Sequence, residues 1–225
     1  MLLSVAPVPR ETLQDHVYLR LKDLILTGEI EPGQSVTIQS IAQAFQVSNM
    51  PVREAFRRLV AEHALTIISG RSVGVPALSL ERLEDLRRVR IEVEGLAAEW
   101  AAERLSSSNL PRLESLVSEM HAAIDANDVK SFLHCNRDFH FAVYAAAQSS
   151  TLASMIENLW LQVSPYFNLL HESGNYPRSN REHAQILSAI ARRDGASARA
   201  AIAADIDGAA ANLRSVLGQM RATDG

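Results

Sequence analysis

The feature that most constrains the fold is a pair of short amphipathic segments separated by only three residues. In residues 38–45 apolar side chains recur at helical spacing, and Thr37 precedes them as a typical N-cap residue. A second segment begins after residues 46–48 and has Pro51 in its first turn. Two helices this short and this close meet at a tight turn, so the sequence predicts a helix-turn-helix.

The second of these helices has one apolar face and a basic surface. Its apolar side chains recur one turn apart, while Arg53, Arg57 and Arg58 lie elsewhere on the helix. Guanidinium groups pair well with guanine edges and with phosphates, so this is the pattern of a recognition helix. The alternative is a small helical domain whose arginines only face solvent. An amphipathic pattern over residues 13–25 predicts one more helix, which ends at Gly28.

Two short β-branched runs follow, at residues 65–68 and 73–75, and residues 69–72 join them. This arrangement predicts a hairpin with Arg71 at its tip, which is the shape of a DNA-binding wing. The formal net charge of the whole chain is -4, which alone argues against nucleic acid. Residues 48–75, however, contain four arginines and two glutamates, a local charge of +2. A basic face is therefore expected where the helix-turn-helix lies.

The length of 225 residues predicts two domains, at 1–78 and 79–225. Cys135 is the single cysteine, which excludes an intrachain disulfide and favours a reducing compartment. No apolar run is long enough to span a bilayer, and residues 1–10 do not have the pattern of a signal peptide. We therefore expect a cytoplasmic protein with no membrane contact.

The second domain shows helical patterns without any strand pattern. Turn and capping residues divide it into six expected helices, at residues 79–105, 109–126, 128–147, 151–170, 179–193 and 195–221. Short connections favour an antiparallel bundle. The predicted fold class is mainly α: an N-terminal winged helix-turn-helix with a small β wing, and a C-terminal antiparallel bundle of about six helices.

Polar residues interrupt the apolar stripes of this bundle at a few positions. Arg90 stands in the inward series of its helix, and Asn136 and His140 are four residues apart on one apolar face. His183 and Asp205 occupy similar positions on the last two helices. An amide, two imidazoles and a carboxylate suit a divalent transition metal, and the alternative is a hydrogen-bonded polar core.

Residues 25–34 (ILTGEIEPGQ) and 47–59 (VSNMPVREAFRRL) resemble the two signature stretches of winged helices in the GntR superfamily of bacterial transcription regulators. The resemblance implies DNA contact through Arg53, because the family context Pro-Val-Arg-Glu-Ala is intact. On this basis the residues expected at the DNA are Thr37, Gln39, Ser48, Asn49, Met50, Arg53, Arg57 and Arg71.

The chain departs from the family pattern at two places. Most members have arginine where Asn49 stands, and a Glu-Arg pair near Ile38 and Gln39. Asparagine either pairs with adenine or caps the helix. We therefore expect an operator that differs from the family norm.

The second domain resembles the FCD ligand-binding domain of the FadR-like branch, through residues 90–94, 136–140 and 182–187. In metal-binding members an Asp or Asn and a His one turn apart join two further histidines. The matching positions here are Asn136, His140, His183 and Asp205. The resemblance thus implies a site for zinc, nickel, manganese or iron. Aspartate in place of the last histidine makes the ligand set chemically harder, and this either shifts the metal preference or abolishes metal binding.

Effectors in this family are commonly small carboxylates. The residues expected to bind one are Arg90, Tyr166 and Asn168, since an arginine fork suits a carboxylate. The predicted function is a homodimeric repressor that a small acid releases from a pseudo-palindromic operator. Two rival interpretations are a DNA-binding metal sensor without organic effector and a metal-dependent hydrolase with Glu182 as base. We expect no enzyme, because phosphate-loop, nucleophile-elbow and His-Glu-x-x-His motifs are absent.

Overall fold

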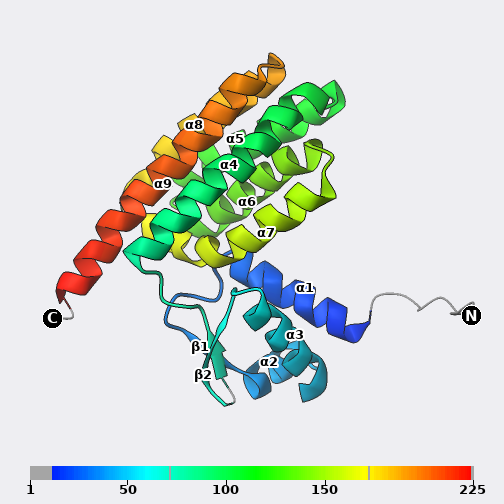
Figure 1. Ribbon diagram of the computed structural model, residues 1–225, viewed down its shortest axis with the longest axis vertical. Coiled ribbons are helices and arrows are strands. Elements are labelled where there is room, and N and C mark those ends of the chain that lie inside the picture. Colours follow the sequence, from blue (N-terminus) through cyan, green and yellow to red (C-terminus); the bar gives the residue numbers. More distant parts are fainter. Residues whose placement is uncertain (1–11, 71, 172, 224–225) are drawn as a thin grey trace, which may run out of the picture.

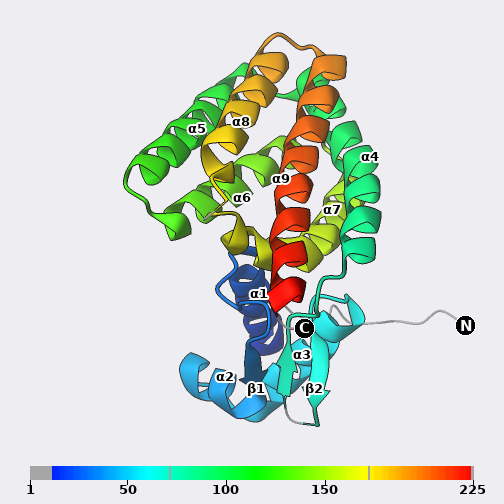
Figure 2. The ribbon, with the colours of Figure 1, turned by 90° about the vertical axis from the view of Figure 1, so that its left-hand side faces the viewer.

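The computed structural model describes residues 12–70, 72–171 and 173–223 of the chain. Figure 1 shows a small N-terminal lobe of helices and strands below a larger bundle of helices, and Figure 2 shows the same two layers from the side. The N-terminal lobe consists of α1 (Leu13–Leu26), β1 (Ser35–Thr37), α2 (Ile38–Phe45), α3 (Asn49–Ala61), β2 (Thr66–Ser69) and β3 (Ser72–Gly74).

The tight turn between α2 and α3 has a clear local cause. Thr37 caps α2 through a capping box with Ser40, as its sequence position predicts. Gln46 ends the helix in the left-handed region, with φ of 54°. The chain then enters α3 after only two residues, so the helix-turn-helix is confirmed.

The wing is a three-stranded antiparallel sheet in the order β1-β3-β2. β2 and β3 form the expected hairpin, in which Ile67 pairs with Val73. The short strand β1 was not expected; it adds to the free side of β3, with Val36 opposite Val73. The expected wing-tip residue Arg71 lies outside the described residues.

The bundle contains the expected antiparallel helices, and two of its helix boundaries differ from the sequence prediction by more than two residues. Its elements are α4 (Leu80–Arg104), η1 (Ser107–Asn109), α5 (Leu110–Asp125), α6 (Val129–Ala146), α7 (Ser150–Val163), η2 (Ser164–Leu170), α8 (Asn175–Ala191) and α9 (Gly195–Thr223). The helix expected over residues 151–170 changes to the tighter 3₁₀ form at Ser164, because Pro165 has no N–H for an α-helical bond. α8 begins before Pro177, which the first turn of a helix tolerates.

In the part of the chain that the structure describes, no helix has the length and hydropathy that crossing a bilayer requires. The core of the bundle is formed by apolar side chains of α4, α6, α7, α8 and α9 around the fully buried Phe139, Trp160 and Ile186. Polar side chains interrupt this core in one region, which is the candidate site.

Candidate metal and effector site

Three potential metal ligands converge inside the bundle from three different helices. His140 on α6, His183 on α8 and Asp205 on α9 each place one ligand atom within 4.8 Å of the other two. The Nε2 atoms of the two histidines are 3.1 Å apart. The Asp205 carboxylate lies 3.3 Å from His140 Nε2 and 3.6 Å from His183 Nε2.

These spacings fit a single metal ion. Zinc bonds to nitrogen and oxygen are about 2.0–2.2 Å long, which places two ligands of a tetrahedral ion about 3.3 Å apart. The three measured separations bracket this value. Burial lowers the pKa of His183 to about 3, so its imidazole is neutral and has a lone pair to offer.

Asp205 is the position where the family pattern has histidine, and its surroundings keep it anionic. Burial alone would raise the pKa of Asp205, but the imidazoles of His183 and His140 and the hydroxyl of Ser179 hold it below its usual range. The Ser179 hydroxyl donates to the carboxylate over 2.8 Å. The fourth expected ligand, Asn136, is buried and lines a small cavity together with His140 and Asp205.

A second layer of polar groups orients His140. Its Nδ1 atom lies 3.0 Å from the hydroxyl of Tyr144, which in turn donates to the carboxylate of Glu94. Metal-bound histidines usually have such a partner for their second nitrogen, so this chain suits a ligand role. His183 Nδ1, by contrast, is buried without a hydrogen-bond partner in the described structure.

Arg90 faces this site, as the sequence predicts, and is itself paired. Its Nε atom contacts Glu94 over 2.6 Å and its Nη2 atom over 3.3 Å, and Trp160 donates to the same carboxylate. The guanidinium also lies over the rings of Trp160 and Phe167. Among the described residues Nη1 has no hydrogen-bond partner, which leaves one end of the fork for a ligand.

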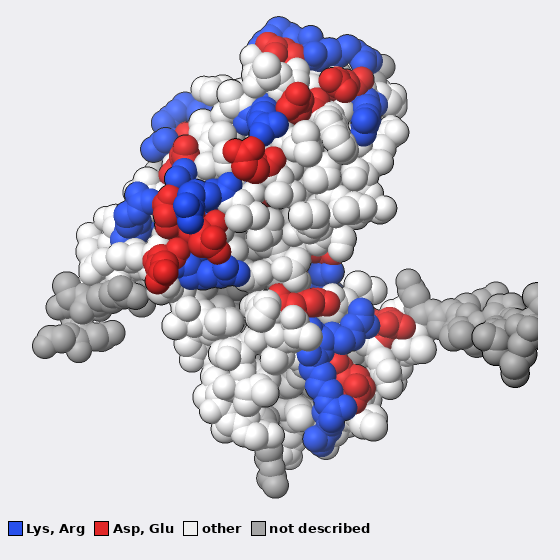
Figure 3. All heavy atoms as spheres, viewed as in Figure 1, with Lys and Arg blue, Asp and Glu red and all other residues white. Residues whose placement is uncertain are grey.

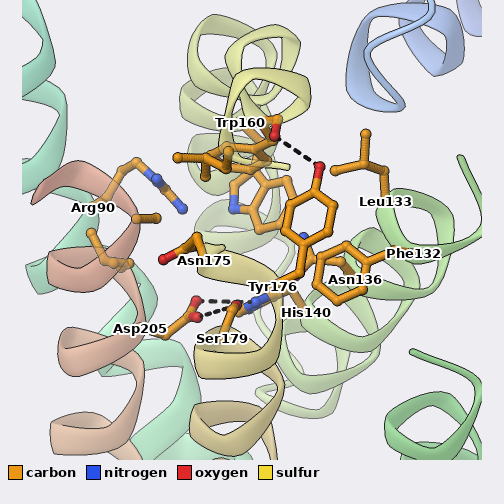
Figure 4. Close-up of a pocket in the computed structure, with 14 residues that line it drawn as sticks. Arg90, Phe132, Leu133, Asn136, His140, Trp160, Asn175, Tyr176, Ser179 and Asp205 are labelled. Atoms are coloured by element: carbon orange, nitrogen blue, oxygen red, sulfur yellow. Dashed lines mark hydrogen bonds and ion pairs between the residues drawn. The ribbon is translucent and has the colours of Figure 1, made fainter. Parts of the chain in front are cut away.

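Arg90, Asp205 and the polar residues of α6 and α8 surround a narrow cavity (Figure 4). Apolar walls come from Phe132 and Leu133 on α6, Trp160 on α7, and Phe167 and Leu170 on η2. The cavity encloses about 20 Å³, roughly the space that one water molecule needs. A metabolite therefore requires the walls to move.

Two of the three residues expected to bind an effector do not line this cavity. The hydroxyl of Tyr166 donates to the carbonyl of Pro76, and Asn168 Nδ2 donates to the carbonyl of Gly28 over 2.7 Å. Both side chains therefore contact the N-terminal lobe. They lie on either side of Phe167, which does line the cavity, and the 3₁₀ conformation of this segment turns them away from it.

The sequence allows Arg90 and Glu94 to form an i, i+4 pair, which the structure contains, but it did not assign roles to Tyr144, Ser179 and Trp160. Tyr144 follows His140 by four residues and Ser179 precedes His183 by four, so helical spacing carries the signal for both. No sequence pattern shows that Trp160 reaches the Glu94 carboxylate, because this contact depends on how α4 packs against α7.

The residues expected at DNA lie on the exposed side of the N-terminal lobe, with two exceptions. Five of them are exposed in or near α3: Ser48, Asn49, Met50, Arg53 and Arg57; Gln39 is exposed on α2. Thr37 is half-buried and its hydroxyl serves the α2 cap. Arg71 lies outside the described residues. Figure 3 shows a band of Lys and Arg side chains along one edge of this lobe.

Comparison with known proteins identifies two domain families in the chain. The family described as "Bacterial regulatory proteins, gntR family" matches residues 13–75, and the family "FCD domain" matches residues 85–208. The predicted domain boundary after residue 78 lies between the two matched segments.

Similar full-length proteins are also known. The transcriptional regulator McbR of Escherichia coli is 30% identical over 187 residues, which cover 81% of this chain and 84% of McbR. The transcriptional repressor RspR of the same organism is 26% identical over 83% of this chain and 82% of its own. The solved structure of E. coli McbR/YncC superposes with a TM-score of 0.84 at 26% identity, over 94% of this chain and 100% of that one.

Proposed function

This chain belongs to the GntR family of DNA-binding transcription regulators and carries an FCD domain, and from this membership we propose that it is a repressor released from its operator by a small carboxylate. The observation that carries the proposal is the cluster of His140, His183 and Asp205 beside a cavity that Arg90 also lines, in a chain whose helix α3 presents exposed arginines. Two relatives of this chain in Escherichia coli, RspR and the galactonate operon repressor, are transcriptional repressors.

In this proposal α3 enters the major groove with its first two turns. Asn49, Met50 and Arg53 are exposed there, and Arg53 makes the fork contact to a guanine or a phosphate. Arg58 plays a different part, because it is held 3.0 Å from Asp15 and its guanidinium lies 3.7 Å from the centre of the Tyr18 ring. It braces α3 against α1 and is not expected to reach DNA.

We propose that the protein acts as a homodimer in the cytoplasm. One recognition helix covers a single half-site, and a symmetric operator requires two at a fixed spacing. Light scattering at micromolar concentration tests this point: a dimer is expected, whereas a monomer that binds one operator tightly would contradict it.

In the bundle, His140, His183, Asp205 and Asn136 would hold the metal ion. The cation would supply Lewis-acid positive charge to an otherwise anionic cavity. Asp205 lines the cavity and Glu94 lies behind it, and both are acidic. Arg90 is the single arginine or lysine among the residues that line the cavity. Because Glu94 is paired with Arg90, a negative effector is expected to bind far better to the metal-loaded protein.

A metal sensor without organic effector is a second candidate, and the small cavity volume favours it. The two candidates differ in a simple measurement. Mono-, di- and tricarboxylates are titrated into metal-loaded protein by calorimetry. Binding of any acid that the metal-stripped protein does not bind supports the effector proposal, and metal binding without acid binding supports the sensor.

The DNA-binding proposal is tested by selection from a random duplex pool, followed by fluorescence anisotropy with the selected sequence. Specific binding is expected to exceed binding to a scrambled duplex by about 1,000-fold or more at physiological salt. Equal affinity for both duplexes would contradict the proposal.

A further inference from the structure

We propose that the 3₁₀ segment η2 couples the cavity to the DNA-binding lobe, with Tyr166 and Asn168 as the positioning residues. This inference rests on the proposed function, in which occupancy of the cavity changes operator affinity. It concerns residues that lie outside the cavity and outside the DNA-binding surface.

η2 makes three hydrogen bonds to backbone carbonyls of the N-terminal lobe and the connection that follows it. Ser164 Oγ donates to Ile25 over 3.3 Å, Asn168 Nδ2 donates to Gly28 over 2.7 Å, and the Tyr166 hydroxyl donates to Pro76. The first two acceptors lie at the end of α1, and the third lies between the wing and α4. The segment therefore contacts the N-terminal lobe where α1 ends and where the chain leaves the wing.

The same segment forms part of the cavity wall. Phe167 and Leu170 line the cavity, and they are three residues apart, which places them on one side of a 3₁₀ helix. The Phe167 ring packs edge-on against Trp160, with centroids 5.7 Å apart. In η2, residues that line the cavity and residues that hold the lobe thus follow each other directly along the chain.

The small cavity makes this wall important. An organic effector does not fit into about 20 Å³, so one wall has to yield. α6, α8 and α9 are regular α-helices, whereas the hydrogen bonds of a 3₁₀ helix have poorer geometry and such segments often act as hinges. Displacement of Phe167 is therefore expected to move Tyr166 and Asn168 with it.

The contact with Gly28 leaves little room for such a movement. Gly28 has φ of +71°, and a Cβ atom there would lie 2.7 Å from Asn168 Nδ2. Other contacts between the lobes lie on α7 and α6, such as Asn158 with the carbonyl of Glu62 and Lys130 with Glu29. None of these four residues lines the cavity. We therefore infer that they hold the two lobes together but do not transmit a change in the cavity to the N-terminal lobe.

The first test needs neither DNA nor effector. Amide hydrogen exchange is measured in the full chain for Phe167→Ala and for Leu133→Ala, which removes a cavity-lining side chain from α6. The amides of Gly28 and Glu29 bond to Ile25 and Leu24, and their exchange is expected to accelerate about tenfold in Phe167→Ala only. Phe167→Leu serves as the milder variant if the alanine variant unfolds. Equal acceleration in the Phe167 and Leu133 variants, or none, would overturn the coupling.

The second test uses the reciprocity of coupled sites, by which DNA binding has to change the cavity if the cavity changes DNA binding. In a Trp100→Phe background the emission of Trp160 reports on the cavity, while anisotropy of a labelled selected duplex reports on DNA binding. The emission is expected to change as DNA saturates the parent protein. In Tyr166→Phe/Asn168→Ala this change is expected to shrink about fivefold or more although DNA still binds.

Asn158→Ala is the matched control, because it removes an amide-to-carbonyl bond between the lobes from α7 and leaves η2 intact. It is expected to retain the emission change. Retention of the full change in the η2 double variant, or its loss in Asn158→Ala alone, would overturn the proposal. If the chain binds no duplex specifically, the proposed function fails, and the exchange experiment still decides whether η2 couples the two lobes.

Discussion

The Nε2 atoms of His140 and His183 face each other across 3.1 Å in the middle of the bundle. A hydrogen bond between them requires one Nε2 to carry a proton and the other to accept it, whereas a cation bound between them takes a lone pair from both. Burial of both rings and the nearby carboxylate make a metal ion the partner that best satisfies all three groups.

The metal content of the purified protein tests this interpretation of the geometry. Protein purified without added metal or a His tag is expected to carry about one divalent ion per chain, and His140→Ala and His183→Ala are each expected to lose it. His134→Ala is the control, since this histidine lies on the same helix but does not belong to the cluster. Elemental analysis measures the metal content of the wild type and the three histidine variants. Wild type that carries no ion and cannot be loaded with zinc, nickel, manganese or iron would identify the cluster as a hydrogen-bonded polar core.

Arg53→Ala is expected to weaken operator binding by about 1 to 3 kcal/mol and to relax discrimination at one base position, because a fork contact to a base is lost. Anisotropy with the selected duplex and its point variants measures both effects. The control is Arg192→Ala, an exposed arginine at the end of α8. If the two variants bind every duplex with equal affinity, Arg53 does not contact the DNA.

Arg90→Ala is expected to lower the free energy of unfolding by about 3 to 5 kcal/mol, because it leaves the charge of the buried Glu94 carboxylate without a counter-charge. Arg178 and Glu182 form a pair with the same i, i+4 spacing in which the arginine is half exposed. Arg178→Ala is therefore expected to cost less than about 1 kcal/mol. Urea denaturation measures the free energy of unfolding of both variants. Similar losses of stability would mean that the Arg90–Glu94 pair is not effectively buried. For effector tests Arg90→Lys is preferable, since it keeps the positive charge beside Glu94.

Gly28→Ala and Gly33→Ala separate backbone strain from contact between the lobes. Both glycines have positive φ, so each alanine costs about 1 to 2 kcal/mol for the left-handed conformation. A Cβ at Gly33 meets nothing within 4 Å, whereas at Gly28 it meets Asn168. In thermal unfolding Gly28→Ala is expected to lose more stability than Gly33→Ala. Adding Asn168→Ala to the Gly28→Ala variant is expected to recover part of this difference. Identical losses of stability in the two glycine variants would show that the Asn168 side chain moves away from the added Cβ at no cost.

Much of the fold was predictable because local chemistry decides it. The Thr37 cap and the spacing of apolar residues on either side of residues 46–48 are sufficient for the helix-turn-helix. The strand β1 was missed because it has only three residues and ends at Thr37, which also caps α2. The end of α7 was missed because the apolar pattern continues through Pro165, while the proline changes the hydrogen bonding.

The sequence predicts that three polar side chains of the candidate site meet in the bundle, but it does not predict most of their surroundings. Helical spacing alone points His140, His183 and Asp205 toward the bundle interior. It also allows Arg90 to pair with Glu94 four residues later, but it does not show that Tyr166 and Asn168 turn away from the cavity to the other lobe. These contacts depend on how helices and lobes pack, which a single sequence does not display.

The central claim is that a small acid bound beside a metal controls operator affinity. The most direct measurement is the affinity of the protein for its selected duplex, determined with a panel of mono-, di- and tricarboxylates in metal-loaded and metal-stripped states. The account predicts that at least one acid weakens operator binding about tenfold or more, and that it does so only in the metal-loaded state. Specific operator binding that no acid of the panel changes in either state would contradict it.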